Sequence, residues 1–379
     1  MNNKTYTPNE EPRPQKSHVF KIWIPTLVLL ILALFLIFQK NQVTAPKNVE
    51  TPEPGSQTAL ETLLYTQLPD LAAKAGHDNW SIDEVQFNDD CTQALVWVAE
   101  TDENSSEMIA REPEIVLAIW DQATQLWQLH LVSDENFSQI FMQSAFKDSE
   151  IASRFFPEAD PKAGPTGKIY GGYYLPWPGG LEKRLTWSVA HSSCNPQYYC
   201  NYAFDFADGT MFDVVAAKGG YVYHWRDTCA NGNSTCTNSI TLEDRTTSPW
   251  TYQIYLHLAQ GSIPASLKTK GVNVRQGQFI AKADDTGPST GHHLHFMVVE
   301  QQTLNACTYY CFGRSEDITF RDVKINWDAG TRGGRPRLEA EASWYGGQGQ
   351  RYYVSGNFAV PMDLPYKLLM FPIYKIAPK

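Results

Sequence analysis

The sequence predicts a mainly β protein, in which an antiparallel β domain follows a small α+β domain and an N-terminal transmembrane helix. The chain has 379 residues, more than a typical domain of about 150 residues, so we expect two folded units. Its 11 Trp, 19 Tyr and 18 Phe favour β structure. From Tyr170 to Val323, short β-prone stretches alternate with Gly, Asn and Pro turns and show little helical periodicity, which predicts the antiparallel β domain.

An uncharged apolar run near the N-terminus, Ile22 to Phe38, predicts a membrane segment. We assign a transmembrane anchor to residues 19–39 and a cytoplasmic tail to residues 1–18. Basic residues before the span outnumber those after it, so the positive-inside rule places the N-terminus in the cytoplasm: the former are Arg13, Lys16 and Lys21, the latter Lys40 and Lys47. We therefore expect a single-pass cell-membrane protein whose folded part is extracytoplasmic.

A cleaved signal peptide is the alternative to an uncleaved anchor. Val43 to Ala45 could serve signal peptidase, although Pro46 directly afterwards disfavours cleavage. The protein would then be secreted.

Six of the seven cysteines form three close pairs, Cys194 with Cys200, Cys229 with Cys236, and Cys307 with Cys311, and Cys91 is left over. Metal thiolates are one interpretation of such pairs. Spacings of six, seven and four residues in loop-like sequence suit short disulfide loops better than a repeated CxxC framework. Each bridge would stabilise by roughly 2 to 3 kcal/mol and persist only in an oxidising compartment. The cysteines therefore also indicate a location outside the cytoplasm.

The N-terminal half reads as a Pro-containing linker over residues 40–56, followed by a small α+β accessory domain over residues 57–155. Leucines recur at helical spacing from Gln57 to Ala75, although Pro69 should break or kink that helix. Four β-prone stretches follow: Glu84 to Phe87, Ala94 to Ala99, Ile115 to Trp120 and Leu126 to Val132. The domain shows no cluster of catalytic residue types, and we interpret His77 and His130 as structural or exposed.

Pro and Gly residues crowd together between Phe156 and Lys168, which predicts a second boundary. We assign the β domain to residues 165–325 and a C-terminal extension to residues 326–379. Within the extension, Tyr352 to Phe358 and Tyr366 to Ile376 are β-prone and are expected to pack on the preceding domain.

The formal net charge of −10, without a dense Lys/Arg stretch, excludes nucleic acid as a partner class, because phosphate binding needs a basic patch.

Histidines in the β domain stand in alternating strand-like contexts. In a strand His293 and His295 share one face while Leu294 and Phe296 enter the core, an arrangement that suits a metal site. The same alternation places His257 on the face of Tyr255, opposite three aliphatic residues, Ile254, Leu256 and Leu258. Further upstream, His191 precedes Asp205, whose carboxylate lies between two Phe residues and would be costly to bury without a cation.

Zinc accepts imidazole nitrogen and carboxylate oxygen, and a catalytic site uses three protein ligands and keeps a fourth position open. The residues for such a site are present in this segment. Taken singly, each piece also has an ordinary explanation, because a His-x-His is often an exposed strand pair and Asp205 could cap a turn.

These pieces resemble, in order and context, peptidase family M23, the lysostaphin-like zinc peptidases. The resemblance covers roughly residues 170 to 300 and rests on three stretches that follow Asp205: Gly209-Thr210 with Val214 to Val222, Gly271 to Ala281, and Thr286 to Phe296. It implies an antiparallel β-sheet groove, with His191, Asp205 and His295 as ligands of one Zn²⁺ and His257 and His293 as catalytic histidines. The long spacing from His191 to Asp205 departs from the family's short motif and looks like the LasA-type branch. His292 is left unassigned.

The resemblance further implies a zinc endopeptidase that cleaves cross-links or stem peptides of bacterial cell-wall peptidoglycan. Zinc lowers the pKa of its bound water towards about 7, and His257 and His293 would orient that water and move its proton, since the chain has no HExxH glutamate. Alternatives are a protease acting on Gly-rich proteins, an inactive wall-binding or scaffold protein of the same fold, and a receptor role for the α+β domain.

Overall fold

The computed structural model describes residues 55–77, 79–102, 106–155, 168–187, 191, 193–196, 199–323 and 352–359. The chain divides into two compact units, Met1–Pro52 and Glu53–Lys379, and all described residues belong to the second. The predicted anchor, residues 19–39, and nearly all of the C-terminal extension lie outside the described residues. Among the residues that are described, no helix is long and apolar enough to cross a membrane.

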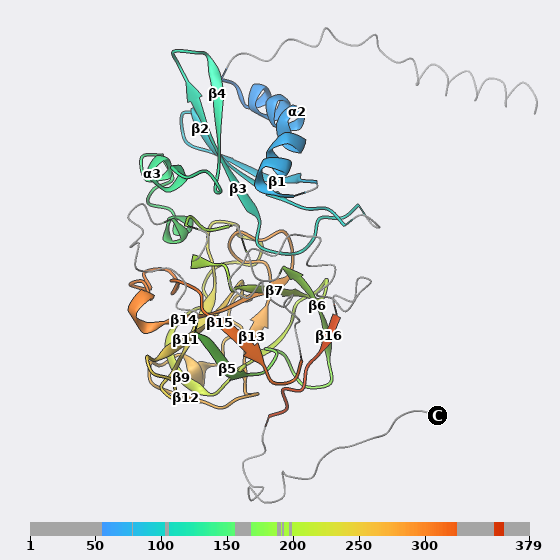
Figure 1. Ribbon diagram of the computed structural model, residues 1–379, viewed down its shortest axis with the longest axis vertical. Coiled ribbons are helices and arrows are strands. Elements are labelled where there is room, and N and C mark those ends of the chain that lie inside the picture. Colours follow the sequence, from blue (N-terminus) through green and yellow to red (C-terminus); the bar gives the residue numbers. More distant parts are fainter. Residues whose placement is uncertain are drawn as a thin grey trace, which may run out of the picture. The chain divides into compact units, whose positions relative to one another are not determined.

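The first part of this unit is a helix, α2, packed on one face of a four-stranded antiparallel sheet (Figure 1). The strands follow one another in chain order. Tight turns join β1 to β2 at Asn88 to Asp90 and β3 to β4 after Asp121, whereas residues 100–113 connect β2 to β3. The bounds are α2 Gln57–Ala75, β1 Ser81–Phe87, β2 Gln93–Ala99, β3 Glu114–Asp121 and β4 Leu126–Leu131. The predicted α+β arrangement of helix and four strands is therefore present.

Helix α2 begins where the Ser56 hydroxyl accepts a hydrogen bond from the Ala59 N–H and ends at Gly76 in the left-handed conformation. The predicted break at Pro69 is absent, because one helix runs through this residue, and a kink there stays a prediction. Proline removes the bond to the carbonyl four residues earlier, which belongs to Tyr65. The Tyr65 side chain is 72% exposed, so that carbonyl lies on the solvent side, where water can bond it.

Strand alternation gives the sheet two buried faces. In β2, Ala94, Val96 and Val98 pack against α2, whereas Leu95 and Trp97 point to the other side. That second face is covered by α3 (Phe137–Phe141) and the 3-10 helix η1 (Glu150–Arg154). Helix η1, which follows the sheet in the chain, thus packs against its second face.

An eight-stranded sheet forms the centre of the second part, in the order β12-β9-β10-β11-β14-β7-β6-β16, and all its pairs are antiparallel. Two small sheets accompany it, β13-β8 antiparallel and β15-β5 parallel. The bounds are β5 Ile169–Tyr173, β6 Glu182–Trp187, β7 Phe204–Ala207, β8 Phe212–Val215, β9 Gly220–Arg226, β10 Ser239–Asp244, β11 Thr251–Leu256, η3 Ala265–Leu267, β12 Asn273–Val274, β13 Phe279–Ala283, β14 His293–Glu300, η4 Gln301–Thr303, β15 Asp317–Phe320 and β16 Tyr352–Val354. The predicted mainly antiparallel β fold is confirmed.

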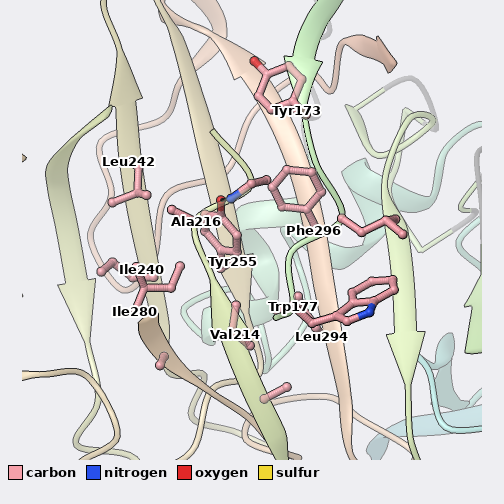
Figure 2. Close-up of a cluster of buried hydrophobic side chains, with 14 of the residues drawn as sticks. Tyr173, Trp177, Val214, Ala216, Ile240, Leu242, Tyr255, Ile280, Leu294 and Phe296 are labelled. Carbon is pink, nitrogen blue, oxygen red and sulfur yellow. Dashed lines mark hydrogen bonds between the residues drawn. The ribbon is translucent and has the colours of Figure 1, made fainter. Parts of the chain in front are cut away.

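The core of this part lies between the large sheet and the strands that fold over it (Figure 2). Leu294 and Phe296 of β14 enter the core, and the Phe296 ring lies 5.0 Å from that of Tyr255, measured between centroids. Because alternate side chains of a strand point to opposite faces, His293 and His295 are turned to the other side. The predicted division of this strand into an apolar face and a histidine face is confirmed.

Candidate active site

Strands β14 and β7 place a histidine and an aspartate directly opposite each other. His295 is the register partner of Asp205, and its Nδ1 lies 3.0 Å from Asp205 Oδ1. Both side chains are completely buried. Two of the three predicted metal ligands are thus held on rigid, paired strands.

His191, the third predicted ligand, follows β6 in sequence and reaches the same place. Its Nε2 lies 3.2 Å from Asp205 Oδ2, and its ring stacks on Trp187 at 4.2 Å between centroids. A disulfide joins Cys194 to Cys200 shortly afterwards. The long insert between His191 and Asp205 therefore still brings both residues together.

His257 and His293 form a second group beside the first, with ring centroids 4.4 Å apart. His257 Nδ1 lies 2.7 Å from the Thr286 carbonyl oxygen, and His293 Nδ1 lies 3.0 Å from that of Gly291. In each ring the Nε2 atom is buried and has no hydrogen-bond partner among the described residues. His293 Nε2 lies 3.9 Å from Asp205 Oδ2, so the two groups adjoin.

The predicted reason for the position of His257 was wrong. Strand β11 ends at Leu256, and His257 has a φ of 60°, so strand alternation does not extend to it. Tyr255, expected on its face, points into the core, and its hydroxyl accepts a hydrogen bond from the Ala217 N–H. A left-handed turn, rather than the strand period, directs this imidazole to the site.

Glu112, which lies just before β3, also enters the site. Its backbone N–H donates to Asp205 Oδ2 at 2.9 Å, and its carboxylate Oε2 lies 3.7 Å from His295 Nδ1. One ligand atom from each of Glu112, His191 and His295 falls within 4.8 Å of the others. A carboxylate from the accessory region thus joins the predicted ligands.

The Glu112 carboxylate has two further close partners. Arg154 of η1 forms an ion pair with Oε1, and the Ser193 hydroxyl donates to Oε2. Glu112, Arg154 and Ser193 are all completely buried. His257 Nε2 lies 3.8 Å from Oε1. The Glu112 carboxylate therefore lies beside the predicted ligand His295 and beside the His257–His293 pair.

The charges of the site favour two ionised carboxylates. Burial opposes ionisation of Asp205, but the neighbouring His191 and His293 outweigh it and hold the pKa of Asp205 well below its usual range. Burial likewise opposes ionisation of Glu112, yet the Arg154 guanidinium beside it lowers the pKa of Glu112. For His293, burial and then the adjacent His257 lower the pKa to about 3.

The predicted ligands suit Zn²⁺. With bonds of about 2.0 Å, the ligand atoms of a tetrahedral zinc site lie about 3.3 Å apart. His191 Nε2 lies 3.2 Å from Asp205 Oδ2, and His295 Nδ1 lies 3.0 Å from the other oxygen, Oδ1. Glu112, which was not predicted, has its Oε2 3.7 Å from His295 Nδ1. Two imidazoles with carboxylate oxygen are also a donor set that zinc prefers.

The remaining predictions fall outside this cluster. His292, which was left unassigned, has its Nδ1 2.6 Å from Asp284 Oδ1. His77, predicted to be structural or exposed, is buried between two glutamates of the accessory region. All three predicted disulfides are present, and Cys91 is free and exposed.

Glu112, Arg154 and Ser193 were not predicted from the sequence. Glu112 stands in an ordinary Arg-Glu-Pro-Glu stretch, and Arg154 is a single basic residue at the end of a short 3-10 helix. Neither has a motif around it. Their roles depend on the packing of one part of the chain on another, which no local pattern encodes.

Comparison with known proteins finds one family model and several solved structures that are similar to this chain. The model of peptidase family M23 matches residues 200–306. Among solved structures, a zinc-containing peptidase from Vibrio cholerae is 15% identical over 70% of this chain and 94% of that chain, with a TM-score of 0.26. Csd3 from Helicobacter pylori is 14% identical over 81% of this chain and 71% of that chain, with a TM-score of 0.24.

A chain of the SpoIIQ–SpoIIIAH pore-forming complex is 21% identical, with a TM-score of 0.21, over 30% of this chain and 65% of that chain. No curated protein matches the sequence. These matches do not separate branches of the family, so the LasA-type assignment stays a prediction.

Proposed function

We propose that this chain, whose residues 200–306 form a peptidase family M23 domain, is a zinc-dependent endopeptidase that hydrolyses the peptide part of bacterial cell-wall peptidoglycan. The observation that carries the proposal is the convergence of His191, Asp205 and His295 beside His257 and His293. Structural zinc sites have four protein ligands, whereas a catalytic site has three and needs proton-transfer groups nearby. The second histidine pair supplies those groups.

His191, Asp205 and His295 would hold the zinc. When bound, the ion supplies Lewis acidity, which polarises a carbonyl and makes water nucleophilic near neutral pH.

His257 and His293 are suited to moving protons. In each ring Nδ1 faces a backbone carbonyl oxygen and therefore carries the hydrogen, which leaves the Nε2 lone pair directed into the site. Such an atom can accept the proton of an attacking water and later deliver it to the leaving amine. An imidazole that has taken up this proton also offers a donor for the negative charge that develops on the carbonyl oxygen.

Cell-wall peptide is the proposed substrate, as cross-links or stem peptides, and Gly-rich proteins are the alternative. The expected anchor at residues 19–39 and the three disulfides support an extracytoplasmic site of action, close to the envelope of the same cell. A wall-binding scaffold without activity would have no need of five converging ligand and proton-transfer groups.

Elemental analysis of the full-length protein, combined with release of muropeptides from purified cell walls, tests the proposal. We expect one zinc per chain, loss of that zinc in a His295→Ala variant, and muropeptide release that depends on zinc once the site is accessible. A chain that folds and binds no zinc would favour the scaffold function instead.

A further inference from the structure

We propose that residues 107–112, here called the covering segment, are an internal inhibitor, and that Glu112 completes the metal site as its fourth ligand. The inference rests on the proposed function, because it concerns access to the same metal. It adds that the full-length chain is latent until this segment leaves the site. Four groups of observations carry it.

The Glu112 carboxylate lies in a position built for it. Arg154 and Ser193 bind its two oxygens, and His295 Nδ1 is 3.7 Å from Oε2. All these groups are completely buried. A buried carboxylate is costly unless it is paired and hydrogen-bonded, and this one is both.

The backbone of the covering segment is fixed to the site by hydrogen bonds. The Thr290 hydroxyl lies 2.6 Å from the Ile109 carbonyl oxygen and 3.0 Å from the Arg111 N–H. The Thr290 N–H donates to the Arg111 carbonyl oxygen at 3.1 Å, and the Glu112 N–H donates to Asp205. The segment is therefore bound along the residues that precede β14.

The two residues directly before Glu112 add to this attachment. The Arg111 guanidinium lies 4.2 Å from the Trp187 ring centroid, on the tryptophan that stacks on His191. Ala110 lies against Gly291, where a built Cβ would come within 3.0 Å of the Ala110 Cβ. A side chain at Gly291 would therefore crowd the covering segment.

Occupation by Glu112 is incompatible with hydrolysis. A zinc ion with three protein ligands keeps its fourth position for water or substrate, and a fourth protein ligand closes the site. The carboxylate is also the group that peptide hydrolysis creates, so Glu112 resembles the new C-terminus of a product. His257 Nε2, proposed to handle the proton, lies 3.8 Å from the same carboxylate.

The test uses full-length protein loaded with Co²⁺, whose visible absorption reports the ligands of the ion, and acetohydroxamate as a small chelating probe. We expect the Glu112→Gln variant to bind the probe at least tenfold more tightly than wild-type protein does. Probe concentrations that saturate this variant should therefore cause no spectral change in wild-type protein. Thr290→Val keeps Glu112 but removes the hydroxyl that holds the covering segment, so it should respond at intermediate concentrations. Muropeptide release should be lowest for wild-type protein, intermediate for Thr290→Val and highest for Glu112→Gln.

Glu114→Gln is the matched control, because Glu114 is buried two residues further on but pairs with His77 instead of the site. It should behave as wild type. If Glu112→Gln fails to fold, Thr290→Val decides the question. Equal responses to acetohydroxamate in wild-type, Glu112→Gln and Thr290→Val proteins would overturn the inhibitor role while leaving the metal site intact. Absence of bound Co²⁺ from folded protein of every variant would instead overturn the proposed function.

Discussion

His295 and Asp205 face each other across the β14–β7 pair, with His295 Nδ1 3.0 Å from Asp205 Oδ1. The sheet register therefore sets the distance between these two proposed ligands before any metal binds. His191 stacks on Trp187 of β6 and lies 3.2 Å from Asp205. The affinity for metal should therefore depend most on the two residues of this strand pair.

The strand pair predicts that Asp205→Asn weakens zinc binding severely. The amide keeps the shape of the side chain but removes the negative charge that faces both histidines. Loss of groups that merely orient a ligand typically costs about 10–100-fold in affinity, so we expect a loss of at least 100-fold, measured by competition with a chelator. Asp284→Asn, which changes a buried aspartate outside the three ligands, should retain zinc; equal losses would contradict the assignment.

Substitution of either histidine of the His257–His293 pair should slow hydrolysis without loss of the bound metal. His257→Ala and His293→Ala, each combined with Glu112→Gln to expose the site, should slow muropeptide release by about 10²–10⁴-fold. Zinc content should stay at one per chain. His130→Ala, a change in the accessory region on β4, serves as the control and should leave the rate unchanged. Full activity of either variant would remove that residue from the mechanism.

The disulfide between Cys194 and Cys200 predicts a stability effect coupled to the site. Replacing both by Ser opens a loop of six residues and should lower the free energy of unfolding by about 2 kcal/mol on the chain-entropy model, measured with denaturant. Because the bridge follows His191 closely, zinc affinity should fall too. Cys91→Ser changes an exposed free thiol and should alter neither quantity.

His77 predicts a pH-dependent contribution to stability. Burial alone would lower its pKa, but hydrogen bonds to Glu100 and Glu114 outweigh this and raise the pKa above 6.5. Since the folded-state pKa is the higher one, the contribution is complete below about pH 6.5 and is lost as pH rises through the folded-state pKa. His77→Gln should therefore cost more stability in acid than in alkali.

His130 provides the comparison for this measurement, because burial lowers its pKa in the folded protein. The stability that it contributes is lost as pH falls, so the cost of His130→Gln should change in the opposite direction. Denaturant unfolding of both variants over the pH range distinguishes the two signs. Costs that do not change with pH would contradict the assigned hydrogen bonds of His77.

Local patterns were sufficient to predict much of the fold and of the site. Period-two alternation predicted the histidine face of β14, and helical spacing predicted α2 despite its proline. The resemblance, more than periodicity, brought His191 and His257 into the site, because a long insert precedes Asp205 and a left-handed residue carries His257. Glu112 and Arg154 escaped prediction because both belong to the accessory region and reach the site histidines only when that region packs against the β domain.

X-ray absorption at the zinc edge of the zinc-loaded full-length protein tests the central claim most directly. We predict a shell of four nitrogen and oxygen ligands at about 2.0 Å, with the scattering pattern of two imidazoles. In Glu112→Gln, one protein oxygen should be replaced by an exchangeable ligand while both imidazoles are retained. A shell containing sulfur, or protein that folds without binding zinc, would contradict the assignment of His191, Asp205 and His295.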